Sequence, residues 1–307
     1  MDIQLIQEME LQNQHWRTAQ RIVLNIFSDV ECRDTSEISQ SSTSRTTHQF
    51  CKFFIKHYSY LLKWYSSQKE MAEVKRRYFN ACGVKVLLGL IDGTMVPIKG
   101  VTGSDEPAFI CRKGYSAINC QFVVDPDGQF RDAVIKFPGS CHDAFVYSNS
   151  TLKQKLEVDP ASGFLFGDSG YGLSPVMITP FSPALNPEEI LFNKTHSRVR
   201  SEIERCFGRL KNRWRCLHKS GGTLQYTPSK CCSIIFTCVT LENMCNSLGL
   251  KDPDTIEVVE DANDGNTEDN GNCSSVGRRQ TNQIRLGIVR RNNLKSYLFA
   301  NRHHCVS

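Results

Sequence analysis

Apolar and polar positions follow two different periods along this chain, and the middle of the chain carries the short period that is typical of strands. Short apolar runs bounded by turn residues predict strands at residues 84–98, 118–124, 130–137, 164–167 and 176–179. Asp-Pro-Asp-Gly at 125–128 joins the second run to the third and is a strong hairpin-turn sequence. The pattern therefore predicts a sheet that begins with antiparallel neighbours.

Longer segments with apolar residues near helical spacing flank these strands. They predict helices at residues 1–31, at 49–80 as one or two helices, and at 142–156, 197–217 and 226–250. The aromatic and basic stretch at 49–80 is compatible with DNA binding, although an aromatic stripe at helical spacing is more often part of a core. Residues 34–47 are rich in Ser and Thr with almost no apolar side chain, and we predict a loop there.

The order of these elements is that of a ribonuclease-H-like core, an antiparallel meander extended by parallel strands with helices outside. We therefore predict an α/β fold with a mixed sheet flanked by helices, in which residues 81–250 form the core and residues 1–80 a small helical region. In such a core the first and fourth strands lie side by side. Asp92 and Asp168, each predicted at the carboxyl end of one of these strands, are then expected to be neighbours at the edge where ligands bind.

The formal net charge of +5 is unevenly distributed. Residues 252–269 carry eight acids and no Lys or Arg, whereas residues 194–219 carry nine basic side chains against two glutamates. Within the C-terminal region, residues 251–307, the acidic part up to 277 has too little apolar surface to offset its ordering entropy, and we predict disorder there. Residues 278–302 follow as a terminal helix or a basic tail. This basic character of the rest of the chain favours nucleic acid as the partner. The alternative is that the basic residues form a solvated helix face.

The composition limits the class of protein. A chain of 307 residues with 40% hydrophobic content can hold one large domain with appendages, or two domains. No stretch approaches the roughly 18 apolar residues of a membrane span, and the first residues show no secretion signal, so we expect a soluble protein without a membrane partner. The 14 cysteines are then expected to be thiols. A zinc site from Cys231, Cys232 and Cys238 is the less favoured alternative to plain buried thiols.

Three acids offer the chemistry of a metal centre. Asp92 and Asp168 each end a short apolar run, and Glu204 lies in the basic helical stretch. Carboxylate oxygens are hard ligands that suit Mg²⁺ or Mn²⁺, and a pair of such ions can clamp the attacking and the leaving oxygen of a phosphodiester. By periodicity Glu202 is an equally good candidate for the third acid of the metal centre. Glu202 and Glu204 flank the apolar stripe through Ile203 on opposite sides, each about 100° away.

Five successive motifs carry a family resemblance. They are GLIDGTMVPI at 89–98, CRKGYSAINCQ at 111–121, FPGSCHD at 137–143, FGDSGY at 166–171 and NKTHSRVRSEIERCFGRLKNRW at 193–214. In sequence and order they resemble the motifs of PIF/Harbinger transposases and of the Harbinger-derived nucleases, which are DDE superfamily endonucleases. The resemblance extends from residue 72 to about residue 250 and is weak at both ends.

The resemblance implies a catalytic and metal-binding triad of Asp92, Asp168 and Glu204. Glu204 is preferred because it occupies the glutamate of the family's Ile-Glu-Arg-x-Phe-Gly motif. Asp143, in the Ser-x-His-Asp motif, is implied as a fourth metal ligand, against the ordinary structural role of an acid that opens a helix. For the adjacent His142 we favour a buried hydrogen-bonding residue over a metal ligand or a phosphate contact.

The resemblance also implies a polynucleotide partner. Met95 stands where the family usually has His after Gly-Thr, so any contact made by that imidazole is absent. The candidate phosphate contacts are basic side chains near the motifs, namely Arg112, Lys113, Arg198, Arg200, Arg209, Lys211 and Arg213. The family implies DNA as the partner, a divalent metal cation (Mg²⁺ or Mn²⁺) as the cofactor, a separate Myb/SANT-like DNA-binding protein, and a nuclear location that does not exclude the cytoplasm. The family resemblance is also compatible with homo-oligomers.

The implied reaction is hydrolysis of a DNA phosphodiester by attack of a metal-activated water, without a covalent protein intermediate. In a true transposase the freed 3′-hydroxyl then attacks target DNA. The main alternative is a domesticated DNA- or chromatin-binding protein that keeps the fold without cutting. A ribonuclease or another phosphodiesterase on the same core is a more distant alternative.

Overall fold

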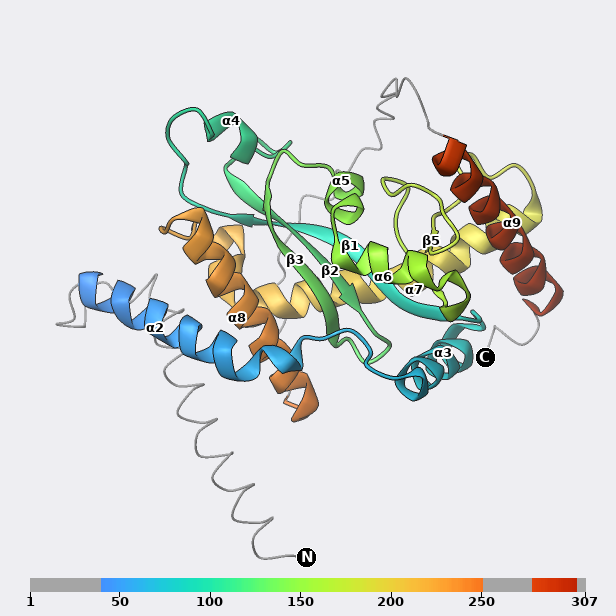
Figure 1. The fold of residues 1–307 in the computed structure, drawn as a ribbon, viewed down its shortest axis with the longest axis horizontal. Helices are drawn as coiled ribbons and strands as arrows, with labels where there is room; N and C mark the ends of the chain where they lie inside the picture. Colours follow the sequence, from blue (N-terminus) through green and yellow to red (C-terminus); the bar gives the residue numbers. More distant parts are fainter. Residues whose placement is uncertain (1–39, 251–277, 303–307) are drawn as a thin grey trace, which may run out of the picture.

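A mixed five-stranded sheet in the order β3-β2-β1-β4-β5 forms the centre of the molecule (Figure 1). The structure is a computed structural model and describes residues 40–250 and 278–302. The strands are β1 (Leu87–Pro97), β2 (Ala117–Val124), β3 (Phe130–Pro138), β4 (Phe164–Phe166) and β5 (Met177–Ile178). The pairs β1–β2 and β2–β3 are antiparallel, and the pairs β1–β4 and β4–β5 are parallel. The ribonuclease-H-like order, with the first and fourth strands adjacent, is confirmed.

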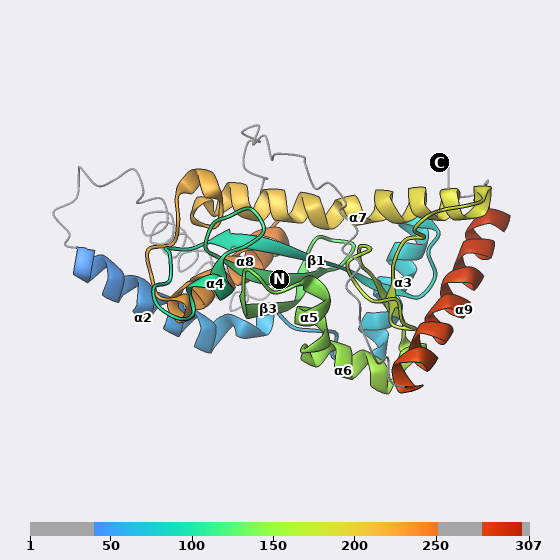
Figure 2. The same cartoon turned by 90° about the horizontal axis from the view of Figure 1, so that it is seen from above.

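The helices lie on both sides of this sheet (Figure 2). Helix α7 (Pro187–Arg213) runs along one face, where the ring of Phe207 packs against Phe122 of β2 with 6.0 Å between centroids. Helix α8 (Pro228–Ser247) packs against β3. On the opposite face lie α5 (Asp143–Ser148) and α6 (Thr151–Val158). The remaining elements are α2 (Gln40–Tyr58), α3 (Gln68–Cys82), α4 (Glu106–Phe109), α9 (Arg278–Ala300) and 3-10 helices at Ser59–Leu61, Pro160–Ser162, Arg215–Leu217 and Lys219–Gly221.

The loop predicted at residues 34–47 is wrong for the part that the structure describes, because α2 already begins at Gln40. Local propensity is overridden by packing, since α2 lies against α8. The amino group of Lys230 on α8 donates 2.7 Å hydrogen bonds to the carbonyl and the hydroxyl of Ser44, and Thr47 is buried with its hydroxyl bonded to the carbonyl of Thr43. Residues 34–39, like the predicted helix at 1–31, fall outside the described residues.

Helix α7 begins at Pro187 and not at residue 197 as predicted. Its start has an ordinary capping sequence, in which Oδ1 of Asn186 accepts a 3.0 Å bond from the backbone N–H of Glu189 and Pro187 occupies the first turn. The helix also ends at Arg213, although the later residues of the predicted stripe, Trp214 and Leu217, are still buried. The prediction started late because it followed the apolar stripe and overlooked the cap.

Two other predictions are refined by the structure. The predicted helix at 142–156 is two helices, because Ser150 starts α6 by accepting a bond from the backbone N–H of Lys153. Of the two readings of residues 278–302, the helix is confirmed as α9, which packs on α7 and β5. Arg290 fixes this helix by donating 2.7 Å bonds to the carbonyls of Pro160 and Pro175. The predicted disorder at 251–277 falls on residues that the structure does not describe.

The junction between α7 and α8 is held by one buried carboxylate. Glu242 of α8 is 1% exposed, and its Oε2 accepts bonds from Nε of Arg213 at 2.9 Å and Nε1 of Trp214 at 3.0 Å. Burial raises the pKa of Glu242, and Arg213 opposes that rise. The adjacent Asn243 uses its amide to bond both the N–H and the carbonyl of Phe130 at the start of β3. These contacts fix the C-terminal end of α7 on the sheet.

In the described ranges, no helix is long and apolar enough to cross a membrane.

We expect Glu242→Ala to lower the free energy of unfolding by about 3 kcal/mol, because the change removes the buried carboxylate that Arg213 and the Trp214 N–H share. Chemical denaturation monitored by circular dichroism measures this loss. Glu157→Ala is the matched control, since Glu157 pairs with Lys153 at 3.8 Å on the half-exposed surface of α6, and should cost at most about 0.5 kcal/mol. Equal losses for the two variants would contradict the anchoring role of Glu242.

Candidate active site

Asp92 lies in the middle of β1, and not at the end of a strand as predicted. The parallel pairing of β1 with β4 ends at Leu90 opposite Phe166, and Asp92 and Asp168 each follow two residues later. Strand β1 continues past this point because its other edge stays paired with β2 as far as Pro97. The two aspartates nevertheless lie close enough that the Asp168 charge acts on Asp92.

The carboxylate of Asp92 is largely removed from solvent. Its Oδ2 accepts a 2.7 Å bond from Nη2 of Arg200 on α7, in an ion pair whose side chains are 17% and 15% exposed. Its Oδ1 accepts a 3.0 Å bond from the backbone N–H of Gly93. Burial raises the pKa of Asp92 to about 7, Asp168 and Asp143 add to the rise, and Arg200 opposes it. A cation near Asp92 therefore offsets a substantial electrostatic cost.

Asp143, the first residue of α5, approaches the same part of β1 from the other face of the sheet. Gly93 leaves the space for it, since a Cβ at this position would collide with the Asp143 carboxylate. Nδ2 of Asn119 donates a 2.9 Å bond to Oδ1 of Asp143, and Nε2 of Gln121 donates a 3.1 Å bond to its backbone carbonyl. Burial raises the pKa of Asp143, and the Asp168 charge adds to this.

The strand register sets which face each acid occupies. Asp92 pairs with Phe122, whose ring packs on α7, while Gly93 pairs with Gln121, which faces α5. Asp92, Asp143 and Asp168 thus surround one short stretch of β1, and we call them the aspartate cluster. The buried phenol of Tyr171, which accepts a 3.0 Å bond from Gln121, has its pKa raised well above 10 by burial and by the charges of all three aspartates.

Glu204 is exposed, and no contact joins it to the aspartate cluster. It lies four residues after Arg200 on α7, about 40° around the helix, so its side chain leaves the helix on the same side as the arginine that reaches Asp92. Glu202 leaves on the other side, where it pairs with Arg205 and lies 3.7 Å from Arg209. Over the described ranges, no three His, Cys, Asp or Glu side chains converge closely enough to hold a metal ion together.

Comparison with known proteins relates the sequence of this chain to a family. Residues 91–243 match the family model described as DDE superfamily endonuclease. The chain is 30% identical over 218 residues to the human and bovine proteins named "Putative nuclease HARBI1", covering 71% of this chain and 62% of theirs. It is 28% identical over 229 residues to "Protein ALP1-like" of Arabidopsis thaliana, covering 69% of this chain and 55% of that one. No solved structure matches the chain significantly.

The chain belongs to the DDE superfamily endonucleases. The predicted resemblance to Harbinger-derived nucleases is thereby confirmed, and a nuclease domain of transposase origin is supported. The matched part spans 62% of the length of the first relatives, so this relation describes the domain and not a complete activity.

The donors of the aspartate cluster suit the divalent metals that DDE superfamily endonucleases generally use. Its carboxylates supply hard oxygen ligands, and burial raises the pKa of Asp92 and of Asp143, so that a cation beside them is electrostatically favourable. The Arg200 guanidinium stands beside Asp92, where a cation is favourable. The residues therefore fit a divalent cation in charge and in donor type. Two of the cysteines of the alternative zinc site, Cys231 and Cys238, are free thiols that are fully buried.

The predicted phosphate contacts divide into two groups. Arg112, Lys113 and Arg198 are exposed and available to a polyanion. The other four, Arg200, Arg209, Lys211 and Arg213, all lie on α7 and are at most half-exposed. Arg200 pairs with Asp92, Arg213 pairs with Glu242, and Arg209 contacts Glu202 and the thiol of Cys206. His142 is exposed, with its Nδ1 3.5 Å from Nη2 of Arg112, so the expectation of a buried histidine is wrong.

Sequence reasoning missed the side chains that support the cluster. Asn119 and Gln121 position Asp143, and Gln121 also binds Tyr171. The signal was present, since two amides alternate within a strand whose other side chains are mostly apolar. Arg200 was assigned only to phosphate, because nothing in the sequence places residues 92 and 200 together.

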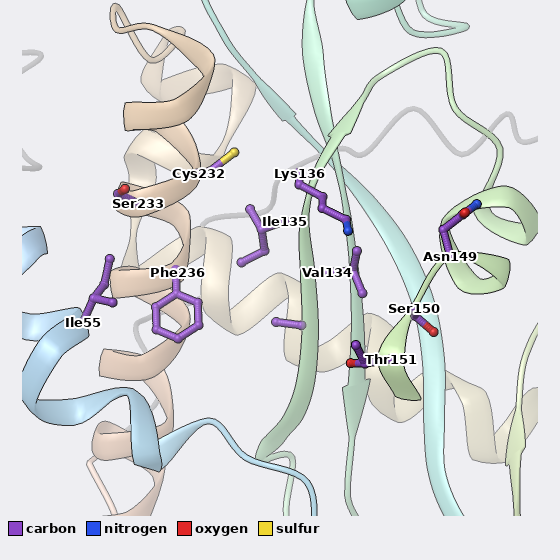
Figure 3. Close-up of a pocket in the computed structure, with 11 residues that line it drawn as sticks. Ile55, Val134, Ile135, Lys136, Asn149, Ser150, Thr151, Cys232, Ser233 and Phe236 are labelled. Atoms are coloured by element: carbon purple, nitrogen blue, oxygen red, sulfur yellow. The ribbon is translucent and has the colours of Figure 1, made fainter. Parts of the chain in front are cut away.

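A groove of about 390 Å³ runs along the outer edge of β3, between α8 with Ile55 of α2 and the turn before α6 (Figure 3). Its walls include Ile135, Phe236 and Ser150, and none of the three aspartates lines it. The aspartate cluster therefore lies around β1 and apart from this groove.

Helix α7 is anchored to the sheet one turn before Arg200 by a neutral histidine. His196 is 3% exposed, its Nε2 lies 3.3 Å from the carbonyl oxygen of Ile178, and its ring centroid is 4.4 Å from that of Phe166. Burial, together with the Arg200 charge, lowers the pKa of His196 from 6.5 to about 4. The imidazole is therefore uncharged at neutral pH.

This lowered pKa predicts a loss of stability in acid. Between about pH 6.5 and pH 4 the unfolded chain binds a proton that folded His196 does not, so the free energy of unfolding falls with pH by about 3 kcal/mol from this residue. Denaturation at a series of pH values should show a shallower decline for His196→Gln than for wild type. His57→Gln, at an exposed position on α2, should leave the wild-type decline unchanged. Parallel curves for all three proteins would contradict the prediction.

Proposed function

We propose that this chain is a metal-dependent endonuclease that hydrolyses DNA phosphodiester bonds. The observation that carries the proposal is the aspartate cluster, three carboxylates placed around one short stretch of β1 in a ribonuclease-H-like sheet, from β1 itself, α5 and the residues after β4. Family membership supports nuclease chemistry, and the raised pKa values of Asp92 and Asp143 support a cationic cofactor.

In this proposal Asp92, Asp168 and Glu204 are the catalytic acids, with Asp143 as a further ligand. Mg²⁺ or Mn²⁺, when bound, would supply Lewis acidity to the attacking and the leaving oxygens of the phosphodiester. The protein contributes the fixed positions of Asp92 and Asp143, which β1 pairing and the Asn119 amide hold in place. Glu204 projects from the side of α7 that faces Asp92, which favours it over Glu202.

Binding of the substrate is assigned to exposed basic residues. Arg112 lies in the loop that precedes β2 and acts electrostatically on Asp143, so it lies near the cluster. Lys113 follows it, and Arg198 is exposed on α7 two residues before Arg200. Contacts from these residues to phosphate would be sequence-independent and sensitive to salt. We also propose a nuclear location, a Myb/SANT-like protein as a partner and homo-oligomers, as the family resemblance implies.

We expect Asp168→Asn to abolish Mn²⁺-dependent cleavage of duplex DNA, because the change removes one ligand charge from the cluster. A nicking assay on a supercoiled plasmid measures the loss, and an unchanged circular dichroism spectrum shows that the fold persists. Asp105→Asn, in the exposed loop before α4, removes the same charge elsewhere and should cut at the wild-type rate. Undiminished cleavage by Asp168→Asn would overturn the assignment.

The two neighbouring glutamates of α7 provide a second, matched comparison. Glu204→Gln should reduce cleavage at least about a hundredfold, as expected when a metal-site group is lost. Glu202→Gln should keep cleavage within about threefold of wild type, because Glu202 pairs with Arg205 on the other side of the helix. The same nicking assay measures both variants. The reverse order of activities would assign the acid to Glu202 instead.

One observation favours the alternative, a DNA- or chromatin-binding protein that does not cut. Arg200 already pairs with Asp92, and Glu204 is exposed with no described contact to the cluster, so the described conformation resembles a structural ion pair. Wild-type protein that binds duplex DNA and shows no Mn²⁺-dependent nicking would support this alternative. A preference for RNA or for an RNA–DNA hybrid in the same assay would point to a ribonuclease.

A further inference from the structure

The ion pair between Arg200 and Asp92 lies where the proposed metal would bind. Nη2 of Arg200 is 2.7 Å from Oδ2 of Asp92, and both side chains are mostly buried. In the described structure Arg200 is the cation in hydrogen-bond contact with the aspartate cluster, while Arg112 and His142 act on Asp143 from the exposed side. A guanidinium and a divalent cation at the same carboxylate oxygen repel each other, so each weakens the binding of the other.

The pair is incompletely satisfied. Nε of Arg200 is buried and has no hydrogen-bond partner. A buried donor that lacks an acceptor costs free energy, and so does desolvation of the two charges, so the pair gains less than its short distance suggests. A ligand with two positive charges competes well for Asp92 under these conditions, because it also offsets the Asp143 and Asp168 charges that the arginine does not contact.

The helix geometry adds a second argument. Arg200 and Glu204 leave α7 on the same side, one turn apart, yet it is the arginine that reaches Asp92 while Glu204 remains exposed. Removal of Arg200 from Asp92 would free the oxygen that the arginine binds and leave Glu204 as the nearest charged group of α7 on that side. Arg200, which competes with the metal for Asp92, and Glu204, which is proposed as a metal ligand, therefore lie on the same helix.

We propose that Arg200 is a placeholder cation, which holds Asp92 in the metal-free protein and is displaced when a divalent cation binds the aspartate cluster. Arg200 thereby sets the metal affinity of the site and couples metal binding to a movement of its own side chain. This inference rests on the proposed function, since it assumes that the cluster binds a metal. It assigns to Arg200 a regulatory role and no contact with the reacting atoms.

The test measures Mn²⁺ binding without DNA. Electron paramagnetic resonance of free Mn²⁺, at constant ionic strength and about pH 8, gives the dissociation constant for wild type, Arg200→Gln and Arg205→Gln. Loss of the competing charge-assisted hydrogen bond should tighten binding by about tenfold in Arg200→Gln. Arg205→Gln, which removes the same charge from an exposed position on the same helix, should stay within about twofold of wild type.

A second measurement follows the displacement itself. In protein labelled with ¹⁵N-arginine, the Nε–Hε signal of Arg200 is assigned by its absence from Arg200→Gln, and saturating Mg²⁺ should shift it. Equal Mn²⁺ affinities for wild type and Arg200→Gln together with an unmoved Arg200 signal would overturn the placeholder role and leave the nuclease proposal standing. Wild type that binds no Mn²⁺ at the cluster, with Asp92→Ala as the reference, would overturn both.

Discussion

Burial of carboxylates around the central strand β1 is the constraint on which the candidate site depends. Asp92 is fixed there because β1 is paired on both edges, with β2 along its length and with β4 at its start. A charge in that position requires compensation, since burial is the largest cause of a pKa raised to about 7. The protein supplies the compensation from α7 through Arg200, and it supplies amide donors for Asp143 from β2.

Helix α7 is the element that connects stability to chemistry. Its start is capped by Asn186, its middle is pinned to the sheet by His196, and its end is fixed by the buried Glu242 of α8. Three anchors leave the helix little freedom to rotate, so the side on which Arg200 and Glu204 project is determined by packing. The same packing turns Glu202 away from β1 and toward Arg209.

Several sequence predictions succeeded because they rest on local patterns. The strand runs, the Asp-Pro-Asp-Gly turn and the helix of α8 all have periodicity or turn chemistry that tertiary contacts do not alter. The failures have the opposite cause. The first part of α2 is Ser- and Thr-rich and is helical because it packs on α8 and bonds Lys230. Asp92 was expected at a strand end because its apolar run stops there, although the strand predicted to residue 98 indeed continues as β1 to Pro97 through pairing with β2.

The sequence by itself determined the family and the order of strands and helices, and it supplied the candidate acids, because motifs and periodicity are properties of contiguous residues. Only the tertiary structure decided which charges face one another. It brought Arg200 to Asp92 across more than a hundred residues, placed Asp143 against Gly93 on the opposite face of the sheet, and left Glu204 exposed. The physical reason is that burial and Coulomb interaction depend on distance in space, which the strand register and the rotation of α7 set together.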